Sequence, residues 1–426
     1  MSQPITAVIV GAGHRSLQYA SYSKAHPDRL RIVGLAEPND LRREQTAKEY
    51  NLPADRCFRT AEELAARPKF ADAAINGTMD KEHVPTSLPL LAAGYHLLLE
   101  KPIGHTREQV MDLLKAARAA KRTVMICHVL RYAPFYVEIR KRIARGDLGE
   151  ILNIQTAECV SYHHMSVAFV RGKWSRTADC GSSMLLSKCC HDLDLITWLK
   201  TGAPPRQVHS LGGLTYFCPE KAPKSAGTRC LVDCPIESEC LYSAKKIYLD
   251  HPDRWHFYVW SFIEHLENPT LEQKAQSLRT DNPHGRCVWK CDNDVVDHQS
   301  VVIRFDDGST ATHNMVGGVS RPGRKIHVIG TKGEIEGLME DGSFMVWTPD
   351  QRPGKETAGE RVDLNVSADM HGGGDLRLVE DFIHAIRGEP SSISSTNLED
   401  SIYGHLAVFG ADQAMKENKV VELERI

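Results

Sequence analysis

The chain lacks a dominant charge and a long apolar run. Its 426 residues carry 52 Lys and Arg against 55 Asp and Glu, which argues against nucleic acid or another polyanion as the main partner. No apolar stretch reaches membrane-spanning length, and the first one leads into a glycine turn, unlike a signal peptide. Repeats and low-complexity tracts are also missing. We therefore expect a cytoplasmic protein that does not bind membranes, long enough for two domains.

A glycine-rich turn near the start predicts a dinucleotide site. In "AVIVGAGHRSLQYA", residues 7–20, an apolar run reads as a buried strand that turns into a helix. The glycines allow a pyrophosphate to approach the backbone, and the helix start supplies free N–H groups. A serine replaces the third glycine, whose usual role is close packing between helix and strand, and its hydroxyl is small enough to donate to a phosphate oxygen. The predicted cofactor residues here are Gly11, Gly13, His14, Arg15 and Ser16.

An acidic residue after the second predicted strand favours NAD. Glu37 follows "LRIVGLA", where its carboxylate can accept hydrogen bonds from both ribose hydroxyls and would repel a 2′-phosphate. Arg42 and Arg43 follow closely and leave NADP open as the alternative, because an arginine can hold that phosphate.

The pattern of strands and helices changes once along the chain. Alternating strand and helix signals over 1–127 predict a doubly wound parallel sheet, a Rossmann domain in an α/β protein. Residues 128–426 predict an α+β domain with an open, largely antiparallel sheet, because "SVVIRFDDGSTATHNMV" and "KIHVIGTKGEIEG" are rich in hairpin signals. A segment at about 209–295, with clustered Cys, Pro and Trp, interrupts this second domain.

Several motifs resemble one family in their order. "TMDKEH", with Thr78 and His83, precedes Glu100-Lys101-Pro102, and "RYAPFYVEIRKRIARGDLGEI" and "HDLDLITWL" follow. This order resembles the Gfo/Idh/MocA family of NAD(P)-dependent sugar and polyol oxidoreductases over nearly the whole chain, apart from the cysteine segment. The resemblance implies that Lys101 lies beside the nicotinamide and the substrate hydroxyl, and that Thr78, His83 and Glu100 line the cofactor site.

The predicted active-site helix departs from the family at one position. Many members carry an aspartate four residues before the histidine, whereas "SKCCHDLD" has Ser187 there, with a new lysine, Lys188, beside it. His191 can serve as general acid or base because its unperturbed pKa lies near neutrality. Asp194 follows three residues later on the same helical face. The predicted catalytic residues are Lys101, His191 and Lys188.

A cationic and aromatic stretch predicts the substrate side. Aromatic faces stack on sugar CH groups and arginines bind oxygens in pairs, so a sugar that carries a carboxylate, phosphate or sulfonate is one expectation. The predicted substrate residues are Arg131, Tyr132, His163, His164, Arg171, Trp174 and Asp194.

The cysteine segment predicts a metal or a set of reduced thiols. Cys218, Cys230, Cys234 and Cys240 lie close enough in sequence to surround one structural Zn²⁺. Cys287 and Cys291 leave the ligand set open, an iron–sulfur cluster is a further alternative, and free thiols are typical of a reducing compartment.

Two activities follow from the resemblance. The first is hydride transfer between NAD and a ring carbon, C3, of a sugar. The alternative is an NAD-dependent glycosidase of the same superfamily, acting on a sulfosugar or another anionic glycoside by transient C3 oxidation, elimination, water addition and re-reduction. A cofactor-binding sensor is a third class, disfavoured by the intact Lys101. The family's open sheets also predict a homo-oligomer, a dimer or tetramer.

Overall fold

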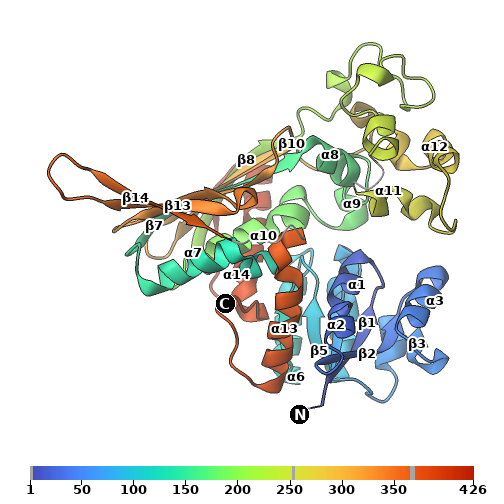
Figure 1. The fold of residues 1–426 in the computed structure, drawn as a ribbon, viewed down its shortest axis with the longest axis horizontal. Helices are drawn as coiled ribbons and strands as arrows, with labels where there is room; N and C mark the ends of the chain where they lie inside the picture. Colours follow the sequence, from blue (N-terminus) through green and yellow to red (C-terminus); the bar gives the residue numbers. More distant parts are fainter. Residues whose placement is uncertain (1–2, 252–254, 365–369) are drawn as a thin grey trace.

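The computed structural model describes residues 3–251, 255–364 and 370–426. Figure 1 shows two lobes: a parallel sheet flanked by helices contains the N-terminus, and a wider sheet lies across the top of this lobe. The β13–β14 hairpin extends away from both lobes as an arm. The predicted class, a Rossmann domain joined to a domain with a largely antiparallel sheet, is confirmed.

The N-terminal sheet has six parallel strands in the order β3-β2-β1-β4-β5-β6. Its strands are buried apolar runs, as expected of a sheet covered on both faces. The strands are β1 (Ile5–Val10), β2 (Leu30–Ala36), β3 (Cys57–Phe58), β4 (Ala73–Asn76), β5 (His96–Leu99) and β6 (Val124–Ile126). The helices are α1 (His14–Ala20), α2 (Tyr22–Ala25), α3 (Asp40–Glu49), α4 (Ala61–Ala65), α5 (His83–Ala92) and α6 (Arg107–Ala120).

The C-terminal sheet has nine strands in the order β14-β13-β12-β11-β7-β10-β9-β8-β15. Among these strands β7 and β10 pair in parallel, and the other pairs are antiparallel. The strands are β7 (Ile151–Ser161), β8 (Pro205–Gly213), β9 (His298–Phe305), β10 (Thr310–Val319), β11 (Gly323–Gly330), β12 (Glu334–Leu338), β13 (Ser343–Pro349), β14 (Thr357–Asp363) and β15 (Val421–Glu422).

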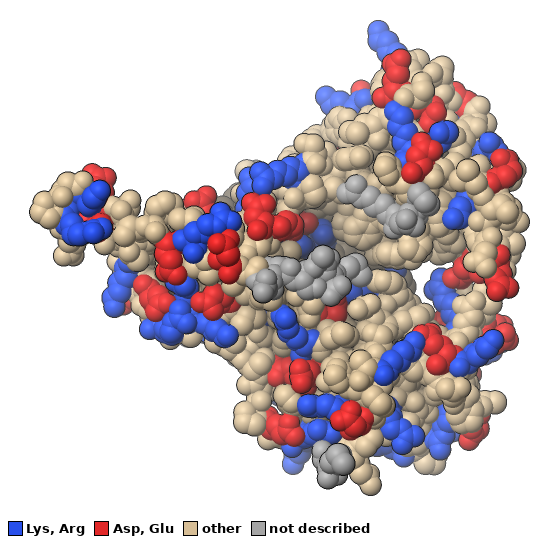
Figure 2. Space-filling model, in the orientation of Figure 1, with Lys and Arg blue, Asp and Glu red and all other residues tan. Residues whose placement is uncertain are grey.

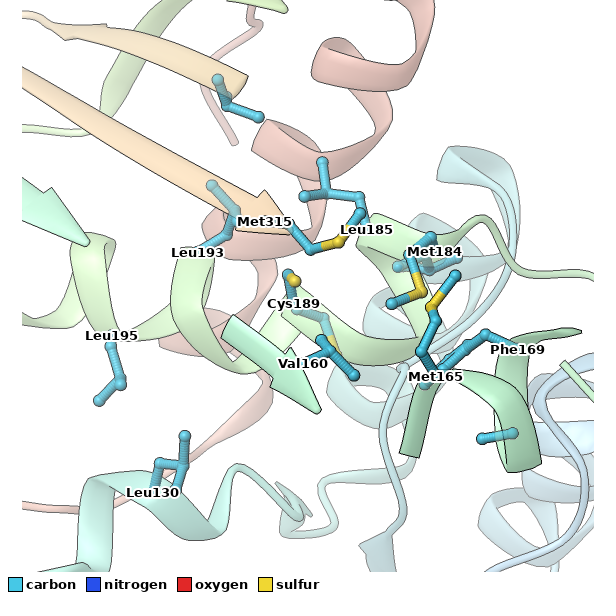
Figure 3. Packing of buried hydrophobic residues seen from close by; sticks show 14 of the residues in the cluster. Leu130, Val160, Met165, Phe169, Met184, Leu185, Cys189, Leu193, Leu195 and Met315 are labelled. Atoms are coloured by element: carbon cyan, nitrogen blue, oxygen red, sulfur yellow. The ribbon is translucent and has the colours of Figure 1, made fainter. Parts of the chain in front are cut away.

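Helices fill the space between the two sheets. They are α7 (Pro134–Arg145), α8 (Tyr162–His164), α9 (Thr177–Cys180), α10 (Met184–Leu199), α13 (Gly374–Arg387) and α14 (Leu398–Glu417). Helix α10 is buried on almost every side, and Figure 3 shows Cys189 and Leu193 of α10 beside Met315 of the sheet. Helix α13 packs into the core of the N-terminal lobe, so late residues of the chain complete the first domain.

The cysteine-rich segment has little sheet of its own. The structure pairs 209–213 with β9, so the segment begins after Gly213, later than predicted, because those residues continue a strand. Its α-helices among the described residues are α11 (His256–Val259) and α12 (Leu271–Arg279).

The surface in Figure 2 mixes acidic and basic side chains and shows an opening between the lobe of α11 and α12 and the N-terminal lobe. None of the helices in the described part of the chain has the length and apolar character that a membrane crossing requires.

Candidate active site

The turn after β1 places two glycines at the carboxyl end of the parallel sheet. Gly11 has a φ of +77°, and a Cβ there would lie 3.0 Å from backbone atoms of Thr78. Gly13 is the N-cap of α1 and brings no side chain over the start of the helix. The backbone can therefore approach a ligand closely here, which is what a pyrophosphate requires.

Ser16, in the place of the third glycine, serves packing. It is 0 % exposed, and a Cβ on Gly77 would come within 2.2 Å of its hydroxyl oxygen. The small serine thus lets α1 lie against the loop after β4. The predicted contact between this hydroxyl and a phosphate stays a prediction, because the buried oxygen has no hydrogen-bond partner among the described residues.

Glu37 faces the glycine turn from the end of β2. Its carboxylate accepts hydrogen bonds from the N–H of Ala12 at 2.6 Å and of Asn39 at 2.9 Å. A carboxylate offers about four acceptor positions, so capacity for ribose hydroxyls remains. Glu37 is therefore held in place at the position where an adenosine ribose would lie.

The two arginines that left NADP open already have partners. Arg42 donates to Glu264 at 2.9 Å. Arg43 donates to the carbonyl of Glu37 at 2.7 Å and pairs with Asp40. Both guanidinium groups are thus engaged with oxygen acceptors, and this arrangement favours NAD.

The cysteine-rich segment reaches the cofactor side of the molecule. Phe257 of α11 stacks on His14, with ring centroids 4.4 Å apart and planes within 3°. Burial, and then the Arg15 cation, lower the pKa of His14. Glu264 contacts both Arg42 and Asn39 on the far side of the glycine turn. Neither Phe257 nor Glu264 was predicted, because a sequence motif does not reveal contacts across more than 200 residues.

Arg15 and Glu100 hold each other. The Arg15 Nε lies 2.8 Å from a Glu100 oxygen, which also accepts from the Tyr19 hydroxyl at 2.7 Å. Asp375 of α13 pairs with the same guanidinium. Burial raises and Arg15 lowers the pKa of Glu100, with a net result below the usual value. Glu100 is 5 % exposed, so it positions Arg15 and the N–H of Lys101 rather than lining the cofactor site as predicted.

His83 connects two loops of the site. One ring nitrogen lies 2.6 Å from the carbonyl oxygen of Pro102, and the other lies 3.1 Å from that of Thr78. The ring is 1 % exposed. The predicted cofactor contact of His83 is therefore corrected to a positioning role, while Thr78 lies directly over Gly11.

Lys101 meets α10 where the lobes join. Its Nζ donates to the carbonyl oxygen of Ser187 at 2.7 Å. His191 lies one turn further along α10 and is 6 % exposed, with the ring of His128 edge-on to it at 5.6 Å. The structure thus places Lys101 against α10 at Ser187, one turn before His191. Two of the predicted catalytic residues therefore meet at the same helix.

Lys188, the third predicted catalytic residue, pairs with a carboxylate that the sequence analysis missed. Its Nζ lies 3.1 Å from Glu158 of β7, which also contacts Arg324 at 2.8 Å. Arg324 in turn lies 3.2 Å from Asp192. Burial raises the pKa of Asp192 to about 7 although Arg324 opposes the shift. Glu158 follows the buried alternation of its strand, and an acidic residue in that register was the available signal.

Arg131 and Asp194 do not face a ligand. They form a two-pronged ion pair at 2.7 and 2.5 Å, with both side chains 1 % exposed. Tyr132 is buried and donates to Asp381 at 2.8 Å. The prediction that these three residues bind substrate is wrong, because the buried pair satisfies its own charges within the fold.

Two more predicted substrate residues organise the cysteine-rich segment. Arg171 is 3 % exposed and donates to the carbonyls of Arg286 and Tyr242 at 2.6 and 2.8 Å. A ring nitrogen of His163 lies 2.9 Å from the carbonyl of Ile247. These contacts correct the predicted roles of Arg171 and His163.

His164 and Trp174, the last two predicted substrate residues, lie among aromatic rings. We call His164, Trp174, Trp255 and Tyr258 the aromatic wall. His164 stacks on Trp255, with centroids 4.0 Å apart. Trp174 lies edge-on to Tyr258 at 5.5 Å and donates to Asp80 at 3.2 Å. Burial holds the pKa of His164 well below its usual value, so this ring is neutral.

The cysteines form a different group from the predicted one. Cys230, Cys234 and Cys240 line one small cavity together with Cys287. Cys218 lies outside this cavity, with its thiol directed to the carbonyl of Thr215. Of the four predicted cysteines, Cys218 thus lies apart from the other three, and Cys287 lines the cavity with them.

Comparison with family models covers nearly the whole chain. A model described as an oxidoreductase family with an NAD-binding Rossmann fold matches residues 5–128, and a model of the C-terminal alpha/beta domain of that family matches 140–423.

Similar individual proteins are dehydrogenases or carry an oxidoreductase name. The chain is 24% identical over 349 residues to YteT, named an oxidoreductase, of Bacillus subtilis (strain 168), covering 76% of this chain and 78% of that protein. It is 24% identical to the inositol 2-dehydrogenase of Corynebacterium glutamicum (strain R), over 47% of this chain and 55% of that one. A levoglucosan dehydrogenase structure, in complex with NADH and levoglucosan, shares the fold with a TM-score of 0.71 and 15% identity over 100% of both chains.

Proposed function

The chain belongs to the Gfo/Idh/MocA family of oxidoreductases, and from this premise we propose that it transfers a hydride between NAD and the C3 ring carbon of a carbohydrate. One observation carries the proposal: Lys101, at the end of a parallel strand of the cofactor domain, donates to the carbonyl of Ser187, one turn before His191. A hydroxyl that lies between these residues has two partners for its proton.

The described residues fit a dinucleotide. Gly11 and Gly13 leave the space above α1 free of side chains, and Glu37 is fixed as an acceptor for the ribose. His14, backed by Phe257, presents a flat ring at the turn. Bound NAD supplies the hydride acceptor.

Lys101 and His191 have different roles when the substrate hydroxyl loses its proton. The Lys101 side chain, held by a carbonyl rather than a carboxylate, can donate to the substrate oxygen, which gains negative charge as its proton leaves and loses it when the hydride leaves the carbon. His191 lies on the same helix at the distance of one turn and can take the proton, because an imidazole exchanges protons near neutrality.

The substrate that fits this site best is a neutral cyclic polyol or sugar. Arg131 pairs with Asp194, Arg171 is held by carbonyls, and Lys188 pairs with Glu158, so these three cations are engaged. The aromatic wall of Trp174, Tyr258 and the stacked pair of His164 and Trp255 offers faces for sugar CH groups. Inositol and levoglucosan, in the names of similar proteins, are neutral rings of this kind.

The redox-neutral glycosidase is the second candidate, supported by the Lys188–Glu158 pair. Elimination requires a base for the C2 hydrogen and an acid for the leaving group, in addition to the pair that serves the C3 hydroxyl. Lys188 follows Ser187 directly and lies 3.1 Å from Glu158, so a second proton-transfer pair adjoins the first.

Turnover with NAD and a panel of substrates separates the two activities. The panel contains inositols, levoglucosan and aryl glycosides of both anomers and of neutral and sulfonated sugars. A dehydrogenase accumulates NADH in proportion to the oxidised neutral ring and releases no aglycone. A glycosidase releases aglycone without net NADH and introduces solvent deuterium at C2. Aglycone release by NAD-free enzyme would overturn both proposals.

An exposed sheet face supports the expected homo-oligomer, a dimer or tetramer. Leu152, Leu211, Val302 and Val316 are 42 to 60% exposed on the neighbouring strands β7, β8, β9 and β10. Exposed apolar side chains on neighbouring strands of one sheet are compatible with a subunit interface. Light scattering after gel filtration should give a mass of two or four chains. None of the twelve cysteines forms a disulfide, in keeping with a cytoplasmic location.

A further inference from the structure

We propose that the cysteine-rich segment binds a four-iron, four-sulfur cluster through Cys230, Cys234, Cys240 and Cys287. The observation behind this proposal is that these four thiols line one small cavity, together with Arg171, Glu237 and mainly apolar side chains; the Glu237 carboxylate accepts from the Ser243 hydroxyl. Cys218 and Cys291 lie outside the lining of this cavity. The proposal is independent of the substrate and of the direction of hydride transfer.

Backbone pairing brings the distant fourth cysteine to the other three. The N–H of Cys230 donates to the carbonyl of Gly285 at 2.9 Å, and the N–H of Cys287 donates to that of Thr228 at 2.8 Å. This short antiparallel contact pairs Arg229 with Arg286 and places Cys230 and Cys287 diagonally across that pair. The turns that follow Cys230 then carry Cys234 and Cys240 around to the same cavity.

The surroundings suit bound thiolates. Arg171 is 3 % exposed and donates towards the sulfur of Cys230 at 3.5 Å, and the N–H of Tyr242 donates to that of Cys240 at 3.3 Å. No carboxylate pairs with Arg171 within the described ranges. A buried cation requires a counter-charge, and a cluster with four thiolates is an anion that supplies it.

The spacing of the sulfurs favours a cluster over a single zinc. Four thiolates around one Zn²⁺ lie about 3.8 Å apart, from Zn–S bonds of about 2.3 Å in a tetrahedron. Over the described residues, no three of these four sulfurs lie within 4.8 Å of one another. A four-iron cluster binds each thiolate to a different iron, so its sulfurs stand further apart.

The cluster would anchor the segment that reaches the cofactor side. Two residues attach the rest of the C-terminal lobe to this segment. Arg171 donates to the carbonyls of Arg286 and Tyr242. A ring nitrogen of His163 contacts the carbonyl of Ile247. The same segment carries Phe257 and Glu264 to the N-terminal lobe. Loss of the cluster is therefore expected to weaken NAD binding more than it slows hydride transfer.

The test is metal analysis of the full-length protein, produced with ample iron and purified without oxygen. We expect about four iron and four sulfide per chain and the broad visible absorption of a cluster, which dithionite bleaches. Cys234→Ser and Cys240→Ser should each lose at least about tenfold in iron. The matched controls Cys218→Ser and Cys291→Ser should retain it.

Each other outcome overturns a stated part of the proposal. About one zinc per chain without iron overturns the cluster, and folded protein without metal overturns the site. Equal iron loss in Cys218→Ser or Cys291→Ser overturns the ligand set. If the ligand variants do not fold, sulfide content and the dithionite response of the unmodified protein decide the question alone.

Discussion

The N-terminal lobe and the cysteine-rich segment face the same cofactor region but are built in different ways. In the N-terminal lobe, Gly11, Glu37 and Lys101 follow directly after buried strands whose parallel order sets their positions. In the segment, Phe257 and Glu264 owe their positions to side-chain contacts with distant residues. The parallel sheet thus positions the predicted cofactor and catalytic residues, and the irregular cysteine-rich segment covers the cofactor region. The predictions below test this division.

The largest effect is expected at Lys101. Lys101→Ala removes the ammonium that meets the substrate hydroxyl, so turnover should fall by about 100- to 10,000-fold. NAD affinity, measured by titration of NADH fluorescence, should change little, because the glycine turn is intact. The exposed Lys115→Ala is the control and should behave as the unmodified protein. Near-normal turnover in Lys101→Ala would show that the group acting on the substrate hydroxyl does not come from the N-terminal lobe.

A large effect on stability is expected where the lobes join. Arg131→Leu leaves the Asp194 carboxylate buried without its partner, which should lower the free energy of unfolding by about 3 to 5 kcal/mol. Denaturant titration measures this loss. The double variant Arg131→Leu with Asp194→Leu should recover part of it, because no lone charge stays buried. An equally unstable double variant would show that packing rather than charge pairing is responsible.

A smaller effect, on NAD binding, is expected in the cysteine-rich segment. Phe257→Ala removes the ring that stacks on His14, a contact worth about 1 kcal/mol, so NAD should bind about fivefold more weakly. Glu264→Ala should act in the same direction. The exposed Leu271→Ala, on α12 of the same segment, should leave NAD binding unchanged. If Phe257→Ala also leaves it unchanged, the segment does not take part in binding the cofactor.

Both regions also share an expected pH dependence of stability. Burial lowers the pKa of His96 in the parallel sheet to about 4 and that of His284 in the segment to about 3. Each group binds its proton more readily in the unfolded chain. The stabilisation is therefore complete above about pH 6.5 and is lost as the pH falls below it.

Denaturant titrations at pH 7 and pH 5 measure this loss. Substituting the buried histidine, His284→Gln, should reduce the slope by up to about 1.4 kcal/mol per pH unit. His96→Gln, at the less buried site, should reduce the slope less. The idea fails if the unmodified protein is equally stable at both pH values.

The sequence predicted the sheets better than it predicted the side chains. Strands β1 and β2 were correctly recognised because each is a short apolar run with a turn signal after it. Arg131 and Asp194 were misassigned because the sequence does not show whether a charged side chain contacts a ligand or a buried partner. Glu158 was missed because its partners Lys188 and Arg324 lie far away in sequence, and only the pairing of distant segments brings them together. Cys287 stayed an open alternative for the same reason.

The contact between Glu264 and the pair Asn39 and Arg42 has a kinetic consequence. It bridges the two lobes at the ribose end of the glycine turn, with the Arg42 and Glu264 side chains 37% and 31% exposed. We expect a dinucleotide bound at the glycine turn to dissociate no faster than this bridge opens. Salt screens a half-exposed ion pair, so the residence time of the cofactor should shorten as ionic strength rises, while the rate of hydride transfer stays the same.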